Sequence, residues 1–232
     1  MEDTSGRTRR ISSYAAALAA CLVLGVFPFL RQEPVPLMWA VDLGVHEFGH
    51  MLTMFWAPRI VAASAGSSMQ VAVPLGLAAY FHFGRKDRVG LALTLAWAGT
   101  SMANVATYIA DAPYQQLELL GGPGGHDWAF IFGPEGLNNL PASGPVSTAV
   151  WIAGAALLVI ATGLCAHGIA GEIAAWRREH LERARIATLP RREPRNPVLV
   201  LESVEAASTP DDAAVAAVVA EERSARLARP SQ

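Results

Sequence analysis

The residues with the clearest chemical potential are two histidines and a glutamate in VHEFGH, residues 45–50. On a helix, residues four apart project from one face, so His46 and His50 can direct their imidazoles at one ion, with Glu47 beside them. This H-E-x-x-H arrangement supplies two neutral imidazoles as zinc ligands and a carboxylate that takes a proton from water. The pattern predicts a zinc centre with Glu47 as its general base.

The surroundings of this motif are apolar. It lies in PLMWAVDLGVHEFGHMLTMFW, which also contains Asp42 one turn upstream of His46. An ionisable side chain at membrane depth costs about 2.5 to 3.5 kcal/mol on insertion scales, so such residues need a compensating role. A metal site that performs hydrolysis provides one, and the apolar setting therefore favours function over chance.

Composition points to a membrane protein. Hydrophobic residues make up 52% of the 232 residues, and the mean hydropathy is +0.30. The net charge of −2 says nothing about a nucleic-acid partner, but the sequence has no basic stripe with interleaved aromatics, so we expect no such partner. Cys21 and Cys165 each lie in an apolar run, which indicates small buried residues and no disulfide framework.

Several stretches approach the length of about 20 residues that crosses a hydrocarbon core. None alternates with the period of barrel strands, so the sequence predicts an all-α membrane protein, a polytopic bundle of four to five transmembrane helices. The candidate stretches are 11–30, 36–57, 66–83, 89–110 and 147–170.

The distribution of Lys and Arg predicts the orientation of these helices. Residues 111–146 contain neither, whereas GRKDR precedes the 89–110 stretch and WRREHLERARIATLPRREPR follows the 147–170 stretch. This places loop 111–146 outside the cytoplasm and both basic flanks inside. The N-terminal RTRR also favours the cytoplasm, so one stretch must be re-entrant or incomplete; we expect 60–83, because SAGSSMQ is small and polar.

The chain therefore divides into parts of different character. We expect a cytoplasmic N-terminal tail, a membrane domain, an interfacial Arg-rich amphipathic helix, and a disordered cytoplasmic tail with a short helix at 211–228. These four parts comprise residues 1–10, 11–170, 171–188 and 189–232. This layout is typical of a multi-pass protein of a bacterial-type inner (plasma) membrane.

HEFGH, with a glycine at position 49 on an apolar helix, resembles the H-E-x-G-H motif of site-2 proteases, the intramembrane zinc metalloproteases. The resemblance covers the motif helix and the layout of several spans. It implies that His46 and His50 bind zinc, that Glu47 activates water, and that a distant aspartate is the third ligand. The expected substrate is a membrane-spanning or membrane-proximal peptide.

The third ligand is harder to assign. The family's aspartate usually lies in N-P-D-G or L-D-G, and the sequence contains neither string and no stretch typical of a PDZ domain. The nearest substitute is LLGGPGGHDWAFIFG, in which Asp127 is our first choice by analogy with the family and His126 the second. Asp111 in ATYIADAPY is the remaining alternative.

Two amides and two other functions complete the expectations. Asn104 and Gln70 could hydrogen-bond a substrate, although amides also join helices inside membranes. An inactive membrane scaffold that keeps the metal site, or a metal-binding or transport protein, is the alternative to a protease. Glu47 separates them, since catalysis needs this carboxylate and a structural zinc site does not.

Overall fold

The structure is a computed structural model that describes residues 4–119, 125–189 and 217. Every regular element of these residues is helical. In chain order the α-helices are α1 (Thr4–Gly25), α2 (Met38–Thr53), α3 (Arg59–Ala79), α4 (Arg88–Ala110), α5 (Asp127–Phe132) and α6 (Ser143–Thr188). π-Helical turns extend α1 over Val26–Arg31 and α3 over Tyr80–Arg85, and a short 3-10 helix, Leu140–Ala142, precedes α6.

Four helical stretches are long and apolar enough to cross a membrane: Ser5–Arg31, Arg59–Arg85, Arg88–Ala110 and Leu140–Thr188. The predicted all-α class is therefore confirmed for the described residues. Helix α2 does not belong to this group, because its 16 residues span only about 24 Å at 1.5 Å per residue.

One expectation about the spans is wrong. Residues 60–83, which we expected to be re-entrant, form the continuous helix α3 and its extension to Arg85. The small residues of SAGSSMQ serve helix packing instead, since Gly66 and Ser67 are buried and α3 makes its most extensive contacts with α2. The incomplete stretch is 36–57, of which only Met38–Thr53 is helical.

Small residues also let the other long helices approach closely. A Cβ atom at Gly99 of α4 would lie 2.7 Å from the backbone oxygen of Gly154 in α6, and Ser147 donates a hydrogen bond to the Ala106 carbonyl at 2.8 Å. Cys21 of α1 and Cys165 of α6 are fully buried and share a cluster with alanines of α1, α4 and α6. Both cysteines are free, as the sequence predicted.

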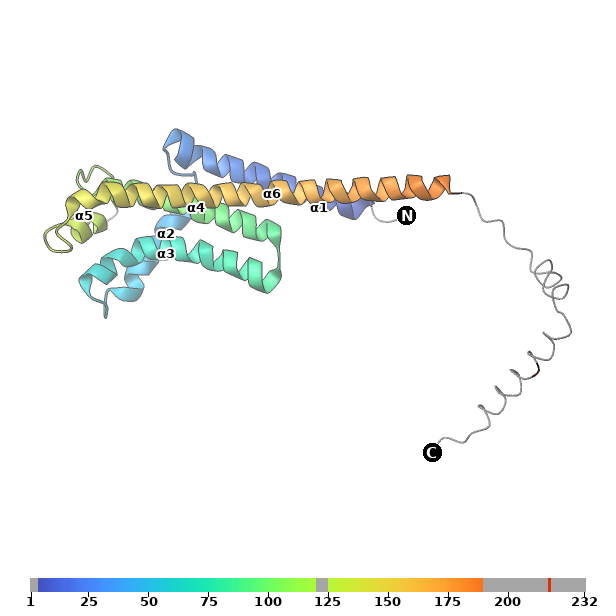
Figure 1. Cartoon of the computed structure of the whole chain (residues 1–232). Helices are drawn as coiled ribbons and strands as arrows, with labels where there is room; N and C mark the ends of the chain where they lie inside the picture. Colours follow the sequence, from blue (N-terminus) through green and yellow to red (C-terminus); the bar gives the residue numbers. More distant parts are fainter. Residues whose placement is uncertain (1–3, 120–124, 190–216, 218–232) are drawn as a thin grey trace, which may run out of the picture. The chain divides into compact units, whose positions relative to one another are not determined.

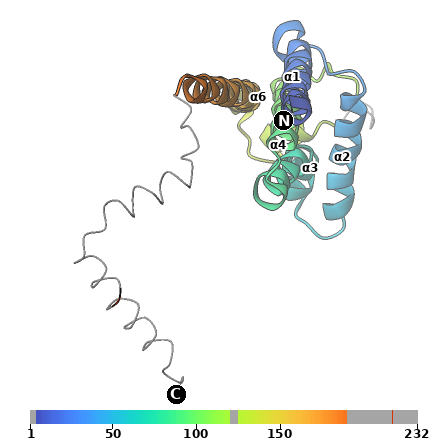
Figure 2. The ribbon, with the colours of Figure 1, turned by 90° about the vertical axis from the view of Figure 1, so that its right-hand side faces the viewer.

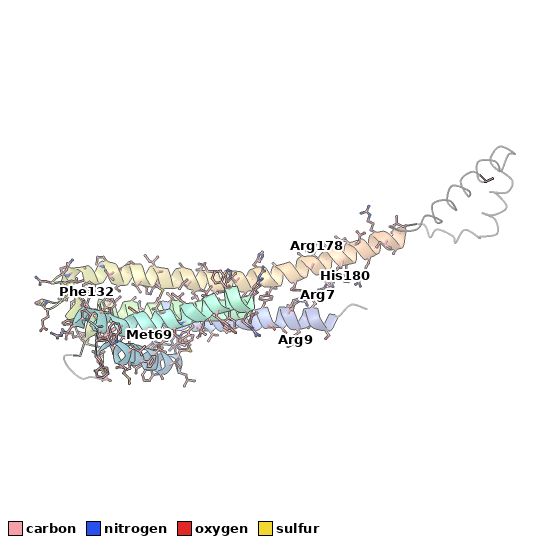
Figure 3. The ribbon with its side chains drawn as sticks, turned by 90° about the horizontal axis from the view of Figure 1, so that it is seen from below. Arg7, Arg9, Met69, Phe132, Arg178 and His180 are labelled. Carbon is pink, nitrogen blue, oxygen red and sulfur yellow. The ribbon has the colours of Figure 1, made fainter. Side chains whose placement is uncertain are left out.

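Residues 4–119 and 125–179 belong to one compact unit, and all site residues discussed below lie in it. Within it α2 runs beside α3 (Figures 1 and 2). The end of the bundle with Arg7, Arg9 and Arg178 is opposite the end that carries α5 with Phe132 (Figure 3). Glu172 of α6 pairs with Arg10 at 2.8 Å, near the end with the arginines.

Residues 171–188 are helical, but they continue α6 without a break and do not begin a separate helix. Gly171, where we placed the start of the interfacial helix, lies inside α6. The predicted tail, 189–232, and its helix at 211–228 lie outside the described residues except for Leu189 and residue 217.

Candidate metal centre

Helix α2 holds the motif residues as the spacing predicted. His46 and His50 lie on the face that packs against α3, and their ring centroids are 4.8 Å apart. His46 is buried, with 8% of its surface exposed, and His50 is half-buried. The proline-rich segment before Met38 stays non-helical, since a residue preceding proline avoids the helical region.

Asp127, the first residue of α5, completes a triangle with the two histidines. Its Oδ2 atom lies 3.2 Å from His46 Nε2 and 3.1 Å from His50 Nε2, and the two Nε2 atoms are 3.0 Å apart. Among the described residues these three side chains form a group that could hold a metal ion. In the sequence, Asp127 follows His46 by 81 positions and His50 by 77 positions, and the fold brings the three side chains together.

The hydrogen bonds behind His50 show why these atoms fit a cation. His50 Nδ1 lies 2.8 Å from the Ala62 carbonyl, which can only accept, so Nδ1 carries the proton. The Nε2 atom of the neutral ring then presents a lone pair to the Asp127 carboxylate and to His46. Lone pairs facing one another at this distance repel unless a proton or a metal ion lies between them. Without a metal, the hydrogen bond with Asp127 favours a proton on His50 and raises its pKa, and a bound metal ion would take the place of that proton.

The distances also suit zinc. In a tetrahedral site with bonds of about 2.0 to 2.1 Å, neighbouring donor atoms are about 3.3 Å apart. The observed separations of 3.0 to 3.2 Å are close to this value. Two imidazoles and one carboxylate leave a fourth position for water or substrate, as catalytic zinc sites require. The donor set therefore fits zinc.

Asp127 is ionised in this setting. Burial alone would raise the pKa of its carboxyl group, but hydrogen bonds and charge interactions with His46 and His50 outweigh burial and hold the pKa at about 2. The carboxylate therefore contributes its negative charge throughout the neutral range, which balances part of the charge of a divalent ion.

Two glycines shape the wall behind the triangle. A Cβ atom at Gly66 of α3 would collide with the Nε2 atoms of His46 and His50. At Gly49, the glycine of HEFGH, a Cβ atom would collide with the Ala65 carbonyl of α3 and lie 2.9 Å from Met69 Cβ. Glycine at both positions lets α3 approach α2 closely enough to form the back of the site.

Tyr108 of α4 is a site residue that sequence reasoning missed. Its hydroxyl accepts a hydrogen bond from the Asp127 backbone N–H at 3.0 Å and lies 3.2 Å from Asp127 Oδ2. The ring packs edge-on against His46, with centroids 5.8 Å apart. In the sequence, only its position one turn before Asp111 in ATYIAD could have indicated that Tyr108 belongs to the site.

His126 and Asp111, the alternative third ligands, do not join the triangle. His126 caps α5, accepting from the Ala129 N–H at Nδ1, and stacks on Tyr108 with centroids 4.4 Å apart. Its Nε2 lies 3.3 Å from Asp111 Oδ2, although the angles are not those of a hydrogen bond. Burial lowers the pKa of His126, against the opposing effect of Asp111, so the ring is neutral.

The Asp111 carboxylate also accepts from the backbone N–H groups of Gln116 and Leu117, both at 3.0 Å. It therefore holds the start of the loop that follows α4. Trp128 ties α5 to α3 through a hydrogen bond to Ser67 at 3.0 Å. These contacts fix α5 and thus the position of Asp127.

The two predicted substrate-binding amides lie next to the triangle in different roles. Gln70 of α3 is buried, and its Oε1 lies 3.3 Å from His46 Nδ1. Its Nε2 donates to Asn104 Oδ1 at 3.1 Å. Gln70 thus contacts a histidine, whereas Asn104 is half-buried and lines a cavity.

That cavity has a volume of about 710 Å³ and adjoins the triangle. Glu47 is exposed and lines it together with His46, His50 and Asp127, and its carboxylate has no hydrogen-bond partner within the described part of the chain. Trp39, Leu43, Thr100 and Ala103 also line the cavity, so it offers apolar and polar surface in the immediate neighbourhood of the triangle.

Comparison with family models, curated proteins and solved structures found no match for the chain.

Proposed function

We propose that the protein is an intramembrane zinc metalloprotease that resembles the site-2 proteases. The observation that carries the proposal is the convergence of His46, His50 and Asp127 on one point, with Glu47 beside them in a cavity. Two imidazoles and a carboxylate with an open fourth position are the donor set of catalytic zinc sites.

The proposal places the site within a membrane. The four helices that are long and apolar enough to span support this, and an even number of spans puts the basic flanks at both ends on one side, the cytoplasm. Val41, Phe48 and Met51 of α2 do not line the cavity and are apolar and exposed, as expected of a helix that meets lipid.

In this proposal each residue has a distinct task. A bound zinc ion would polarise the scissile carbonyl and lower the pKa of a coordinated water to about 7. Glu47 accepts a proton from the attacking water and later delivers it to the leaving amine. Tyr108 holds Asp127 in place through both the backbone N–H and the side chain.

The cavity favours a peptide substrate over a bare ion pathway. Its volume of about 710 Å³ is in the range of pockets that enclose small organic ligands, far more than an ion needs. Asn104 lies in its wall with its amide nitrogen available to a substrate carbonyl. The substrate would be a segment of a membrane-spanning or membrane-proximal protein.

The test combines metal analysis with cleavage. Detergent-purified wild-type protein should contain one zinc per chain, and His46→Ala should lose it. Glu47→Gln should keep zinc but lose cleavage, measured as new N-termini of membrane proteins that appear in cells expressing the wild type but not this variant.

Folded, monodisperse wild type without zinc would favour a scaffold, and zinc without cleavage would favour a metal-binding or transport protein.

A further inference from the structure

The two histidines of the metal centre differ in the group that lies within hydrogen-bond distance of Nδ1. The Ala62 carbonyl fixes the proton of His50 on Nδ1, because a carbonyl can only accept. His46 Nδ1 faces the side-chain amide of Gln70 at 3.3 Å, and an amide can present either its oxygen or its NH₂ group. With NH₂ toward His46 the ring proton would sit on Nε2, which could not then bind a metal.

The orientation of Gln70 is set by what lies on its other side. The NH₂ group donates to Asn104 Oδ1 at 3.1 Å and interacts with the Asp42 carboxylate. Asn104 could turn its own amide over, but the Asp42 carboxylate, which accepts from Trp97 and Ser101, acts as an acceptor toward Gln70 as well. Asp42 therefore requires the NH₂ group of Gln70 on its side, which leaves Oε1 for His46.

Asp42 is itself held firmly. It is 6% exposed, and its Oδ1 accepts from Trp97 Nε1 at 2.8 Å and from Ser101 Oγ at 3.0 Å. Two neutral donors from α4 thus anchor the carboxylate one turn before His46. Such an arrangement is costly in an apolar bundle unless it does something for the protein.

We propose that Asp42, Gln70 and Asn104 form a relay that holds His46 in the tautomer with its proton on Nδ1, so that Nε2 is free to bind the metal. Gln70 is the positioning residue and Asp42 its anchor. The relay rests on the metal centre of the proposed function. It accounts for a buried aspartate and a buried glutamine that the hydrolytic mechanism does not use, and partners of this kind orient metal-binding histidines.

The relay can be tested by titrating metal-free, full-length protein in detergent with Co²⁺. The visible absorption bands report both affinity and tetrahedral geometry. Gln70→Met keeps the shape of the side chain but removes the acceptor, so Co²⁺ affinity should fall by about 10- to 100-fold with weaker tetrahedral bands. Ser68→Ala, an exposed change on the same helix, should match the wild type.

A swapped pair separates this role from packing. In the double variant Asp42→Asn with Gln70→Glu, the amide and the carboxylate exchange places: Asn donates, Glu accepts, and His46 again meets an obligatory acceptor. Its Co²⁺ affinity should be close to that of wild type and well above that of Gln70→Met. A packing role predicts the same affinity for Asp42→Asn alone as for the double variant, because Asn and Glu keep the shapes of Asp and Gln, whereas the relay predicts weaker binding by the single variant. A double variant as weak as Gln70→Met overturns the relay.

The outcomes also separate the relay from the proposed function. Wild type that binds neither Co²⁺ nor zinc removes the metal centre and the proposed function with it. Wild type that binds Co²⁺ while Gln70→Met binds it equally tightly overturns the relay alone. If Gln70→Met does not fold, the swapped pair still decides, because the relay requires it to bind Co²⁺ like wild type.

Discussion

Gly66 of α3 lies so close to His46 that any side chain at this position would collide with the imidazole Nε2 atom. The same Cβ atom would also collide with Nε2 of His50. The backbone of α3 thus forms the rear wall of the candidate metal centre, and the space between α2 and α3 accommodates the two rings only because residue 66 has no side chain.

Gly66→Ala should therefore disturb both histidines. The added methyl group must push the rings or the helix away, so zinc affinity should fall by at least about tenfold, measured by competition with a chromogenic chelator. Gly76→Ala is the matched control, because it lies on the same helix and its Cβ atom would meet nothing within 4 Å. Normal zinc binding by Gly66→Ala would contradict the observed packing.

The glycine of HEFGH should matter for stability more than for chemistry. A Cβ atom at Gly49 would collide with the backbone of Ala65, so Gly49→Ala should separate α2 from α3 at an overpacking cost of about 1 to 3 kcal/mol. The measurement is thermal unfolding in detergent. Gly44→Ala on the same helix meets nothing within 4 Å and should unfold like the wild type. Equal unfolding of both variants would show that the close approach is not required.

Much of the architecture could be predicted from the sequence. Hydrophobic length alone indicates the helices, and the i, i+4 spacing places His46 and His50 on one face. The failure at 60–83 has a physical reason, since small polar residues favour either an irregular segment or tight helix packing. Only the presence of α2 against Gly66 decides between the two.

Local sequence patterns could indicate only part of the candidate metal centre. The motif residues follow from spacing, whereas Tyr108, Gly66 and the roles of Gln70 and Asp42 depend on which helices are neighbours. A single sequence does not show directly which helices are neighbours. Asp127 could be named only as one of three candidates, because a capping residue and a metal ligand look alike in GGHDW.

Substitution of those three candidates should separate the metal ligand from the two residues with structural roles. Asp127→Ala should lose zinc, since it removes the carboxylate that faces both histidines. His126→Ala removes the cap of α5 and should lower the unfolding temperature while zinc remains, at a cost of about 0.5 to 2 kcal/mol. Asp111→Ala should free the backbone of Gln116 and Leu117 and also keep zinc. Zinc loss in His126→Ala with Asp127→Ala unaffected would reverse the assignment.

Removal of a single hydroxyl group should reveal whether Tyr108 supports the candidate metal centre. Tyr108→Phe keeps the ring that packs on His46 and His126 but leaves the Asp127 backbone N–H and carboxylate without this partner. A hydrogen bond to a charged group is worth about 1.5 to 3 kcal/mol, so zinc affinity should fall by about 10- to 150-fold while the unfolding temperature changes little. Tyr80→Phe, an exposed tyrosine of the turn after α3, is the control. If Tyr108→Phe binds zinc as tightly as Tyr80→Phe, Asp127 is positioned by α5 alone, and Tyr108 serves only as a packing surface for the two histidines.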